Sequence, residues 1–124
     1  AQLEKAAKHA GLITKTAAGT NRRFSVLNRI AIEEIEAWMI GDPAALKAAF
    51  PRLPSSFEAK TKYRSPDAIS GGTAEALEQL LQGAGYYKAG MPKIEVARMV
   101  GSRLRPELNK SPSFQAFAEG LSLL

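Results

Sequence analysis

The sequence predicts a helix-rich α+β fold. Along most of the chain, apolar residues recur three and four positions apart, which is the spacing of one face of an α-helix. One run, RFSVLNRIAI at residues 23–32, is instead enriched in β-branched residues over the length of a strand. Glycine and proline residues interrupt the pattern between segments. We therefore predict one strand with five to six helices packed on it, within a single domain that spans residues 1–124.

The predicted helices begin and end at residues that commonly mark helix ends. Asp42 is a capping residue, and Pro43 follows it in the first turn, where the missing N–H of proline costs nothing. Thr73 takes the same place before a later helix, and Gly11 and Gly41 end two earlier ones. The expected helices cover residues 2–10, 33–40, 43–50, 74–83 and 92–104, followed by a last helix that is capped by Ser111 or Ser113.

Two segments are predicted to be loops. Residues 14–20 are polar, and residues 55–72 contain prolines, serines and paired glycines that interrupt every periodic pattern. The second connection is long for a compact domain. It is therefore either a functional loop or an ordered excursion that packs on the rest of the protein.

The composition excludes several kinds of site. The chain has no cysteine and a single histidine, His9, which excludes disulfides, thiolate metal sites, His-rich zinc clusters and a Ser-His-Asp triad. Any metal site must therefore use oxygen ligands. No window approaches the roughly 18 apolar residues of a membrane span, which predicts a soluble, cytoplasmic domain. The chain opens with AQLEK, without Met or a helix cap, so we expect Ala1 to be an interior position of a longer gene product.

Charge is unevenly distributed along the chain. The formal net charge is +5, yet residues 32–58 carry five acidic side chains against two basic ones. A basic chain with an acidic island is compatible with nucleic acid on the basic faces and a metal ion at the island. Ordinary solvated charge explains the same distribution.

Three glutamates lie at the start of the predicted helix 33–40. Glu33 and Glu36 are three residues apart and share one face of that helix, whereas Glu34 points elsewhere. Two carboxylates on one face suit a hard cation such as Mg²⁺, which makes Glu33 and Glu36 candidate metal ligands. Acidic residues in a first helical turn also gain roughly 0.3–1 kcal/mol each from the helix dipole, so a purely structural role stays open.

Candidate phosphate contacts lie in the second half of the chain. Lys88 and Lys93 flank a glycine-proline turn beside Tyr86 and Tyr87, and they could contact phosphates with aromatic support. Solvated lysines and half-buried tyrosines explain this stretch equally well. The SGGT stretch at residues 70–73 leads into a helix N-terminus, a geometry that can bind an anion, but it lacks the longer phosphate-loop pattern.

Three motifs in the same order resemble the bacterial domain-of-unknown-function family 4276: AIEEIEAWMIGDPAAL, KYRSPDAISGGTAEALEQLLQGAGYYKAGMPKIEVA and SPSFQAF. Members of that family run longer at the N-terminus, with acidic strands similar to the Toprim-like α/β fold of topoisomerases, primases and overcoming-lysogenization-defect nucleases. The resemblance implies that this chain is the C-terminal portion of such a domain. It also implies that Glu33 or Glu36 ligates Mg²⁺ and that Lys88 and Lys93 meet phosphate.

The resemblance further implies Mg²⁺-dependent phosphodiester chemistry on DNA or RNA, linked to phage defence beside a partner ATPase. The N-terminal acidic motifs of the family are absent from this sequence, so we expect this chain alone to be inactive. Two other interpretations stay open. One is a noncatalytic module that docks a partner protein through Trp38, Phe114 and Phe117. The other is nonspecific binding of nucleic acid by the basic segments.

Overall fold

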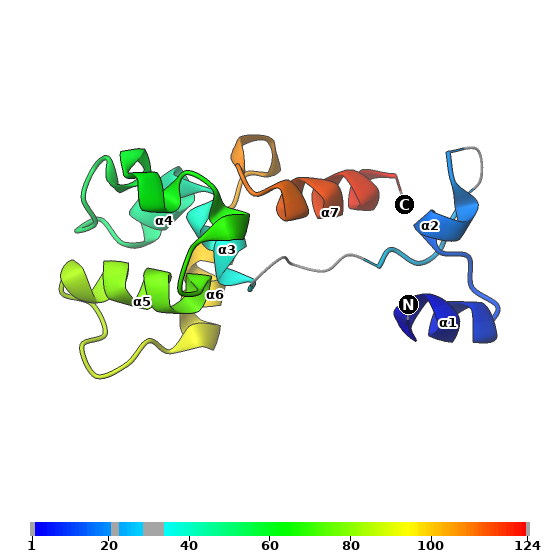
Figure 1. Ribbon diagram of the computed structural model, residues 1–124, viewed down its shortest axis with the longest axis horizontal. Helices are drawn as coiled ribbons and strands as arrows, with labels where there is room; N and C mark the ends of the chain where they lie inside the picture. The colour runs from blue at the N-terminus through cyan, green and yellow to red at the C-terminus, as the bar shows by residue number, and fades with distance from the viewer. Residues whose placement is uncertain (1, 21–22, 29–33, 124) are drawn as a thin grey trace. The chain divides into compact units, whose positions relative to one another are not determined.

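A computed structural model describes residues 2–20, 23–28 and 34–123 of the chain (Figure 1). The chain divides into two compact units. One unit comprises Ala31–Gln115, and the other combines Ala1–Ile30 with Ala116–Leu124. None of the helices in the described ranges is long and apolar enough to cross a membrane. That the whole chain folds as one domain stays a prediction.

The predicted strand is wrong, and the α+β fold class is wrong with it. The described residues form α-helices and short 3-10 helices, with no β-strand and no sheet among them. Within the predicted strand, Val26 forms an isolated parallel bridge to Thr14, and residues 29–32 lie outside the described ranges. A strand needs the backbone groups of a neighbouring strand. β-branched residues favour an extended backbone but cannot supply that neighbour, so a local pattern was mistaken for a sheet.

The unit Ala31–Gln115 consists of short helices around one apolar core (Figure 1). Leu77 and Leu81 are four residues apart on one helix, and Val96 and Val100 are four apart on another. All four side chains are fully buried, together with Phe50. The helices of this unit are α3 (Glu36–Ile40), α4 (Pro43–Ala49), α5 (Thr73–Gly83), α6 (Lys93–Gly101) and the start of α7 (Pro112–Ser122).

The long connection between α4 and α5 is an ordered excursion, one of the two possibilities that the sequence left open. It contains the 3-10 helices η1 (Phe57–Ala59), η2 (Thr61–Tyr63) and η3 (Pro66–Ala68). Phe57 and Tyr63 are buried and meet edge to face, with ring centroids 5.5 Å apart. A further 3-10 helix, η4 (Pro106–Leu108), lies between α6 and α7. Buried aromatic side chains therefore fix a segment that has no helical periodicity of its own.

Several predicted helix ends are confirmed. Asp42 caps α4, since its Oδ1 atom accepts a hydrogen bond from the Ala45 N–H at 3.0 Å. Ser111 caps α7 through a hydrogen bond from the Phe114 N–H to its hydroxyl at 3.2 Å. Pro92 is the N-cap residue of α6 rather than its first helical residue. The caps at Asp42 and Ser111 follow from local backbone chemistry, which explains why the sequence predicts them.

The other unit contains α1 (Gln2–His9), α2 (Lys15–Ala18) and the later part of α7. Gly11 follows α1 with φ of 74°, the left-handed conformation expected of a glycine after a helix. α2 was predicted as loop, because four residues are too few to show a helical period. Thr14 caps α2 by accepting a hydrogen bond from the Ala17 N–H at 3.1 Å.

Candidate functional site

Two of the predicted site residues come together where α3 and α6 begin. Glu36 is the first residue of α3, and Lys93 is the first residue of α6. The Lys93 Nζ atom lies 3.9 Å from Glu36 Oε1, although the two residues are far apart in the chain. The apolar core brings the two helix starts together, because Ile40 of α3 and Val96 of α6 are buried in the same cluster.

The Glu36 side chain is largely buried, and its charged neighbour is Lys93. The Glu36 side chain is only 5% exposed, whereas that of Lys93 is 62% exposed. At 3.9 Å the two groups are beyond hydrogen-bond distance, and an ion pair to so exposed a lysine contributes little to stability. A buried carboxylate costs free energy unless it is paired and hydrogen-bonded. Residues that break a folding rule in this way are expected at functional sites.

Of the two predicted metal ligands, the structure describes one. Glu36 lies in the described part of the chain, whereas Glu33 lies outside the described residues. Within the described ranges, no group of three or more acidic or histidine side chains is arranged to hold a metal ion. The described chain thus offers Glu36 as a single candidate oxygen ligand.

Glu34 has a structural role that the sequence analysis missed. Its Oε2 atom accepts a hydrogen bond from the Ala74 N–H at 2.8 Å, and the Thr73 hydroxyl donates to the same oxygen at 3.4 Å. Thr73 was predicted as the cap of α5 but is its first helical residue, and the N-cap, Gly72, has no side chain to offer. Glu34 therefore supplies the acceptor that the helix N-terminus needs, and its charge is favourable there.

This arrangement also explains the role of the SGGT stretch at residues 70–73. Its geometry does bind an anion at the N-terminus of α5, but the anion is the protein's own Glu34 carboxylate. Gly72 has φ of 96°, and a Cβ atom at this position would collide with the Glu75 carboxylate. The sequence contains one signal for this role of Glu34. A helix that starts after paired glycines has no capping side chain of its own, so its acceptor must come from elsewhere in the fold.

Lys88 is exposed in the turn between α5 and α6, and it joins no ion pair of the described residues. The neighbouring Tyr86 packs its ring against Phe50, with centroids 4.9 Å apart, and the Arg52 guanidinium lies 4.1 Å from the Tyr86 ring centroid. The Tyr86 hydroxyl also accepts a hydrogen bond from the Arg52 N–H at 3.1 Å, which lowers the pKa of that hydroxyl. Burial raises the pKa of Tyr87. The two tyrosines thus hold the turn in place, and phosphate binding by Lys88 stays a prediction.

A polar and aromatic cluster joins the three motifs that carry the family resemblance. The Trp38 indole N–H donates to Ser113 Oγ at 2.8 Å, and the Trp38 ring meets Phe114 edge to face at 5.2 Å. Asp67 accepts hydrogen bonds from the Ser111 hydroxyl at 2.6 Å and from the Ser113 N–H at 2.8 Å. The sequence analysis missed Asp67, because its partners lie 44 and 46 residues further along the chain. Much of what the motifs encode is therefore the assembly of this unit.

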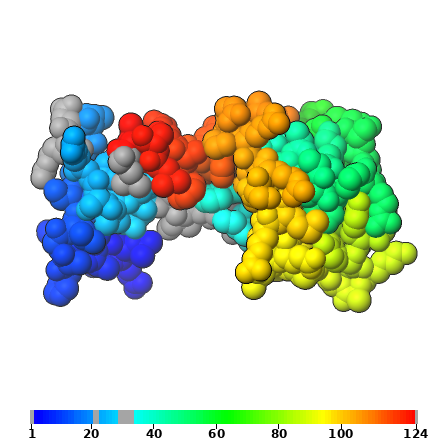
Figure 2. Space-filling model, turned by 180° about the vertical axis from the view of Figure 1, so that it is seen from behind, coloured from blue at the N-terminus to red at the C-terminus, as the bar shows by residue number. Residues whose placement is uncertain are grey.

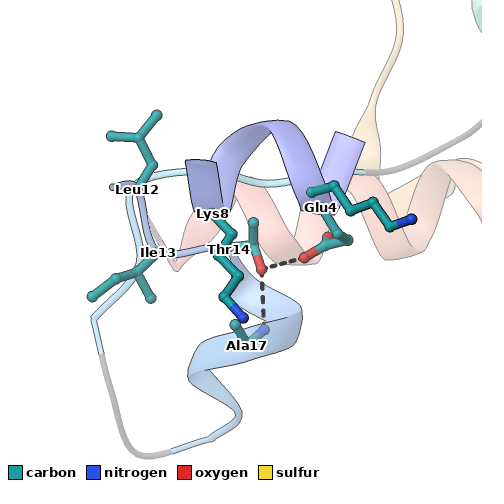
Figure 3. A pocket seen from close by; sticks show the side chains of 7 residues that line it. Glu4, Lys8, Leu12, Ile13, Thr14 and Ala17 are labelled. Carbon is teal, nitrogen blue, oxygen red and sulfur yellow. Dashed lines mark hydrogen bonds between the residues drawn. The ribbon is translucent and has the colours of Figure 1, made fainter. Parts of the chain in front are cut away.

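The unit that contains α1 and α2 has a hollow of its own, of about 380 Å³ (Figure 3). Leu12 and Ile13 lie on one side of it, and Glu4 lies on the other. Glu4 accepts hydrogen bonds from the Thr14 hydroxyl at 2.5 Å and from the Asn28 side chain at 3.0 Å. These two bonds lower the pKa of Glu4, the bond from Thr14 contributing most. They tie the start of α1 to the segment after it, so this carboxylate has a structural role.

Comparisons with known proteins give one match. The model of a family described as Domain of unknown function (DUF4276) matches residues 1–122 of the chain. Neither the curated proteins nor the solved structures contain a significant match. The function of the chain is therefore inferred from the chemistry of the site.

Proposed function

The chain belongs to the family described as Domain of unknown function (DUF4276), and we propose that it forms part of a Mg²⁺-dependent enzyme that acts on phosphodiester bonds. One observation carries the proposal: the buried carboxylate of Glu36 lies beside the exposed ammonium group of Lys93. A carboxylate for the metal and a cation for the phosphate are the two charges that metal-assisted phosphoryl chemistry uses. In this proposal Glu36 holds Mg²⁺ and Lys93 neutralises the substrate phosphate.

The proposed Mg²⁺ site needs few ligands from the protein. This ion is commonly held by one or two carboxylates together with water and substrate phosphates, rather than by a cage made of protein alone. Glu36 supplies one carboxylate, and Glu33 is the second candidate from the sequence. A bound Mg²⁺ would neutralise phosphate charge and make a bound water easier to deprotonate.

Lys93 has two tasks in this proposal. When no metal is bound, its ammonium group offsets the charge of Glu36. When metal and substrate are present, the same group turns away from Glu36 and meets a phosphate oxygen. The exposed, flexible stem of Lys93 permits this movement, and a contact at 3.9 Å is weak enough to break at little cost. Lys93 and Mg²⁺ therefore compete for Glu36.

The likeness to Toprim-like enzymes supports the rest of the proposal by analogy. In this analogy the substrate is DNA or RNA. The enzyme works beside a partner ATPase in phage defence. Glu36 and Lys93 support the chemistry, whereas the analogy supports the identity of the substrate and the partner.

Docking of a partner protein through Trp38, Phe114 and Phe117 stays a prediction, and we do not prefer it. Trp38 and Phe114 contact each other inside the unit Ala31–Gln115. The Trp38 N–H is engaged with Ser113 as well. These contacts explain the two aromatic residues without a partner.

Binding of Mn²⁺, a paramagnetic substitute for Mg²⁺, tests the proposal without any need for activity. In the two-dimensional amide NMR spectrum of the full chain, Mn²⁺ should broaden the signals of the residues around Glu36 and Lys93. Glu36→Gln should abolish this broadening, because it removes the charge and keeps the shape of the side chain. Lys93→Gln should shift the titration to several-fold lower Mn²⁺ concentrations, because it removes the competing cation.

A matched control is Glu107→Gln, which removes an exposed carboxylate on η4 and should leave the broadening unchanged. If Mn²⁺ broadens the amide signals of the Glu36→Gln variant as strongly as those of the unsubstituted chain, Glu36 is not the ligand. If Lys93→Gln binds Mn²⁺ more weakly, the proposed competition is wrong. Folding of each variant is checked by the dispersion of the same spectrum.

A further inference from the structure

A second charged feature of the unit Ala31–Gln115 lies where the segment after α6 passes α4. A hollow of about 440 Å³ is lined there by Ala44, Ala45 and Ala48 of α4 and by residues 102–105. Figure 2 shows the segment that follows α6, in orange, beside the blue-green surface that includes α4. The alanine side chains of α4 are short, so the floor of the hollow lies close to the helix backbone.

Two arginines line the rim of this hollow; the side chain of Arg103 and the backbone N–H of Arg105 each donate a hydrogen bond to the surrounding structure. The Arg103 Nη1 group donates to the Met99 carbonyl at 2.6 Å. The Arg105 N–H donates to Asp42 Oδ2 at 2.7 Å, and Asp42 is only 1% exposed. Both arginine residues are nevertheless exposed. The rim thus presents two cations whose chain segment is fixed before any ligand arrives.

The charge of this region favours an anionic ligand. Residues 98–110 carry four basic side chains against one acidic side chain, Glu107. The carboxylate of Asp42 is buried, and its two oxygens accept backbone hydrogen bonds from Ala45 and Arg105. Guanidinium groups recognise phosphate through paired N–H donors, and backbone contacts of this kind position a nucleic acid without reading its sequence.

We propose that this hollow binds the phosphodiester backbone of a single nucleic acid strand, with Arg103 and Arg105 each contacting a phosphate. The choice of a nucleic acid over another polyanion rests on the proposed function, since a phosphodiester enzyme needs a surface that holds the strand beyond the reacting bond. The short alanine floor admits the sugar-phosphate chain close to α4. The contact is independent of metal and does not use Glu36.

Binding of a fluorescein-labelled oligothymidine strand, measured by fluorescence anisotropy in EDTA, tests the inference with the full chain. Arg103→Gln combined with Arg105→Gln should weaken binding at least tenfold at low salt. The same double substitution should lower the slope of log Kd against log salt concentration by about 1.4, which is the loss of two phosphate contacts on a single strand. Replacing both arginines by lysine keeps the charge, so it should restore most of that slope.

A control of equal charge change is Lys60→Gln combined with Arg64→Gln, two exposed residues near the 3-10 helix η2. This variant should bind within twofold of the unsubstituted chain. Equal losses of affinity for the strand in both double variants would overturn the inference, because net charge alone would then explain binding. Equally strong competition by polyglutamate would overturn the preference for phosphate.

The test is separate from that of the proposed function. Because EDTA removes divalent metal, loss of strand binding in the arginine variant tests the hollow and not the metal site. Mn²⁺ broadening around Glu36 in that same variant should be unchanged. If the unsubstituted chain shows the Mn²⁺ broadening but does not bind the strand, the inference about the hollow is overturned while the metal site stands.

Discussion

At the scale of single residues, two neighbouring glutamates have opposite roles. Glu34 accepts two hydrogen bonds at the start of α5, which is where a helix favours an anion. Glu36, two positions later, is buried beside a lysine that is too far for a hydrogen bond. The first carboxylate stabilises the fold, and for the second we expect a free-energy cost that a ligand would relieve.

This contrast predicts opposite effects of the same substitution at the two sites. Glu36→Gln should raise the free energy of unfolding by about 1 kcal/mol, because it removes a charge buried with weak pairing. Glu34→Gln, the matched control, should lower it, because a charge-assisted hydrogen bond becomes a neutral one. Urea denaturation of both variants measures the two changes. A loss of stability in Glu36→Gln would show that Glu36 serves the fold.

At the scale of secondary-structure elements, several helices in the unit Ala31–Gln115 are completed from distant parts of the chain. The start of α5 uses Glu34, and the start of α7 uses Asp67. Gly41 follows α3 with a helical backbone, and the need for glycine there is tertiary, because a Cβ atom would collide with the side chain of Asn109. Short helices cannot persist alone, so these contacts decide where they begin and end.

The contact between Asp67 and the start of α7 can be tested through the single tryptophan. Asp67→Ala removes the acceptor for the Ser111 hydroxyl and the Ser113 N–H, which should lower the free energy of unfolding by about 1–3 kcal/mol. Because Trp38 donates to Ser113, its fluorescence should shift to longer wavelength as the helix start loosens. Asp67→Asn keeps one acceptor and should have a smaller effect. Unchanged Trp38 emission in Asp67→Ala would contradict this account of the cluster.

At the scale of the whole molecule, the two units differ in how much apolar surface they bury. The core cluster, which includes Leu46, Phe50 and Leu77, belongs entirely to the unit Ala31–Gln115. In the described part of the other unit, the buried apolar side chains are Ala7 and Ala18. Two alanines bury little apolar surface, so local opening of that unit should cost far less free energy than opening of the unit Ala31–Gln115.

Hydrogen exchange of the full chain should therefore be faster in the unit that contains α1 and α2 than in the unit Ala31–Gln115. Backbone amides of α1 and α2 should exchange roughly a hundredfold or more faster than those of α5 and α6. Mass spectrometry of peptic fragments can measure both sets in one experiment. Equal protection of α1 and α5 would show that the small unit is stabilised by something other than its own core.

The sequence by itself determined the helices whose signals are local. Asp42 and Ser111 cap their helices as predicted, and the four-residue spacing of Leu77 and Leu81 marks the buried face of α5. The family was also recognisable from its motifs. These features depend on neighbours within a few positions, which a linear sequence displays directly.

Tertiary structure decided the rest, because the deciding partners lie far along the chain. The predicted strand at residues 23–32 needed a second strand, which the described residues lack. Glu34 and Glu36 look alike in sequence, and only the positions of Ala74 and Lys93 separate a helix cap from a candidate metal ligand. Spacing places side chains on one face of a helix, whereas burial and pairing depend on what the fold brings opposite that face.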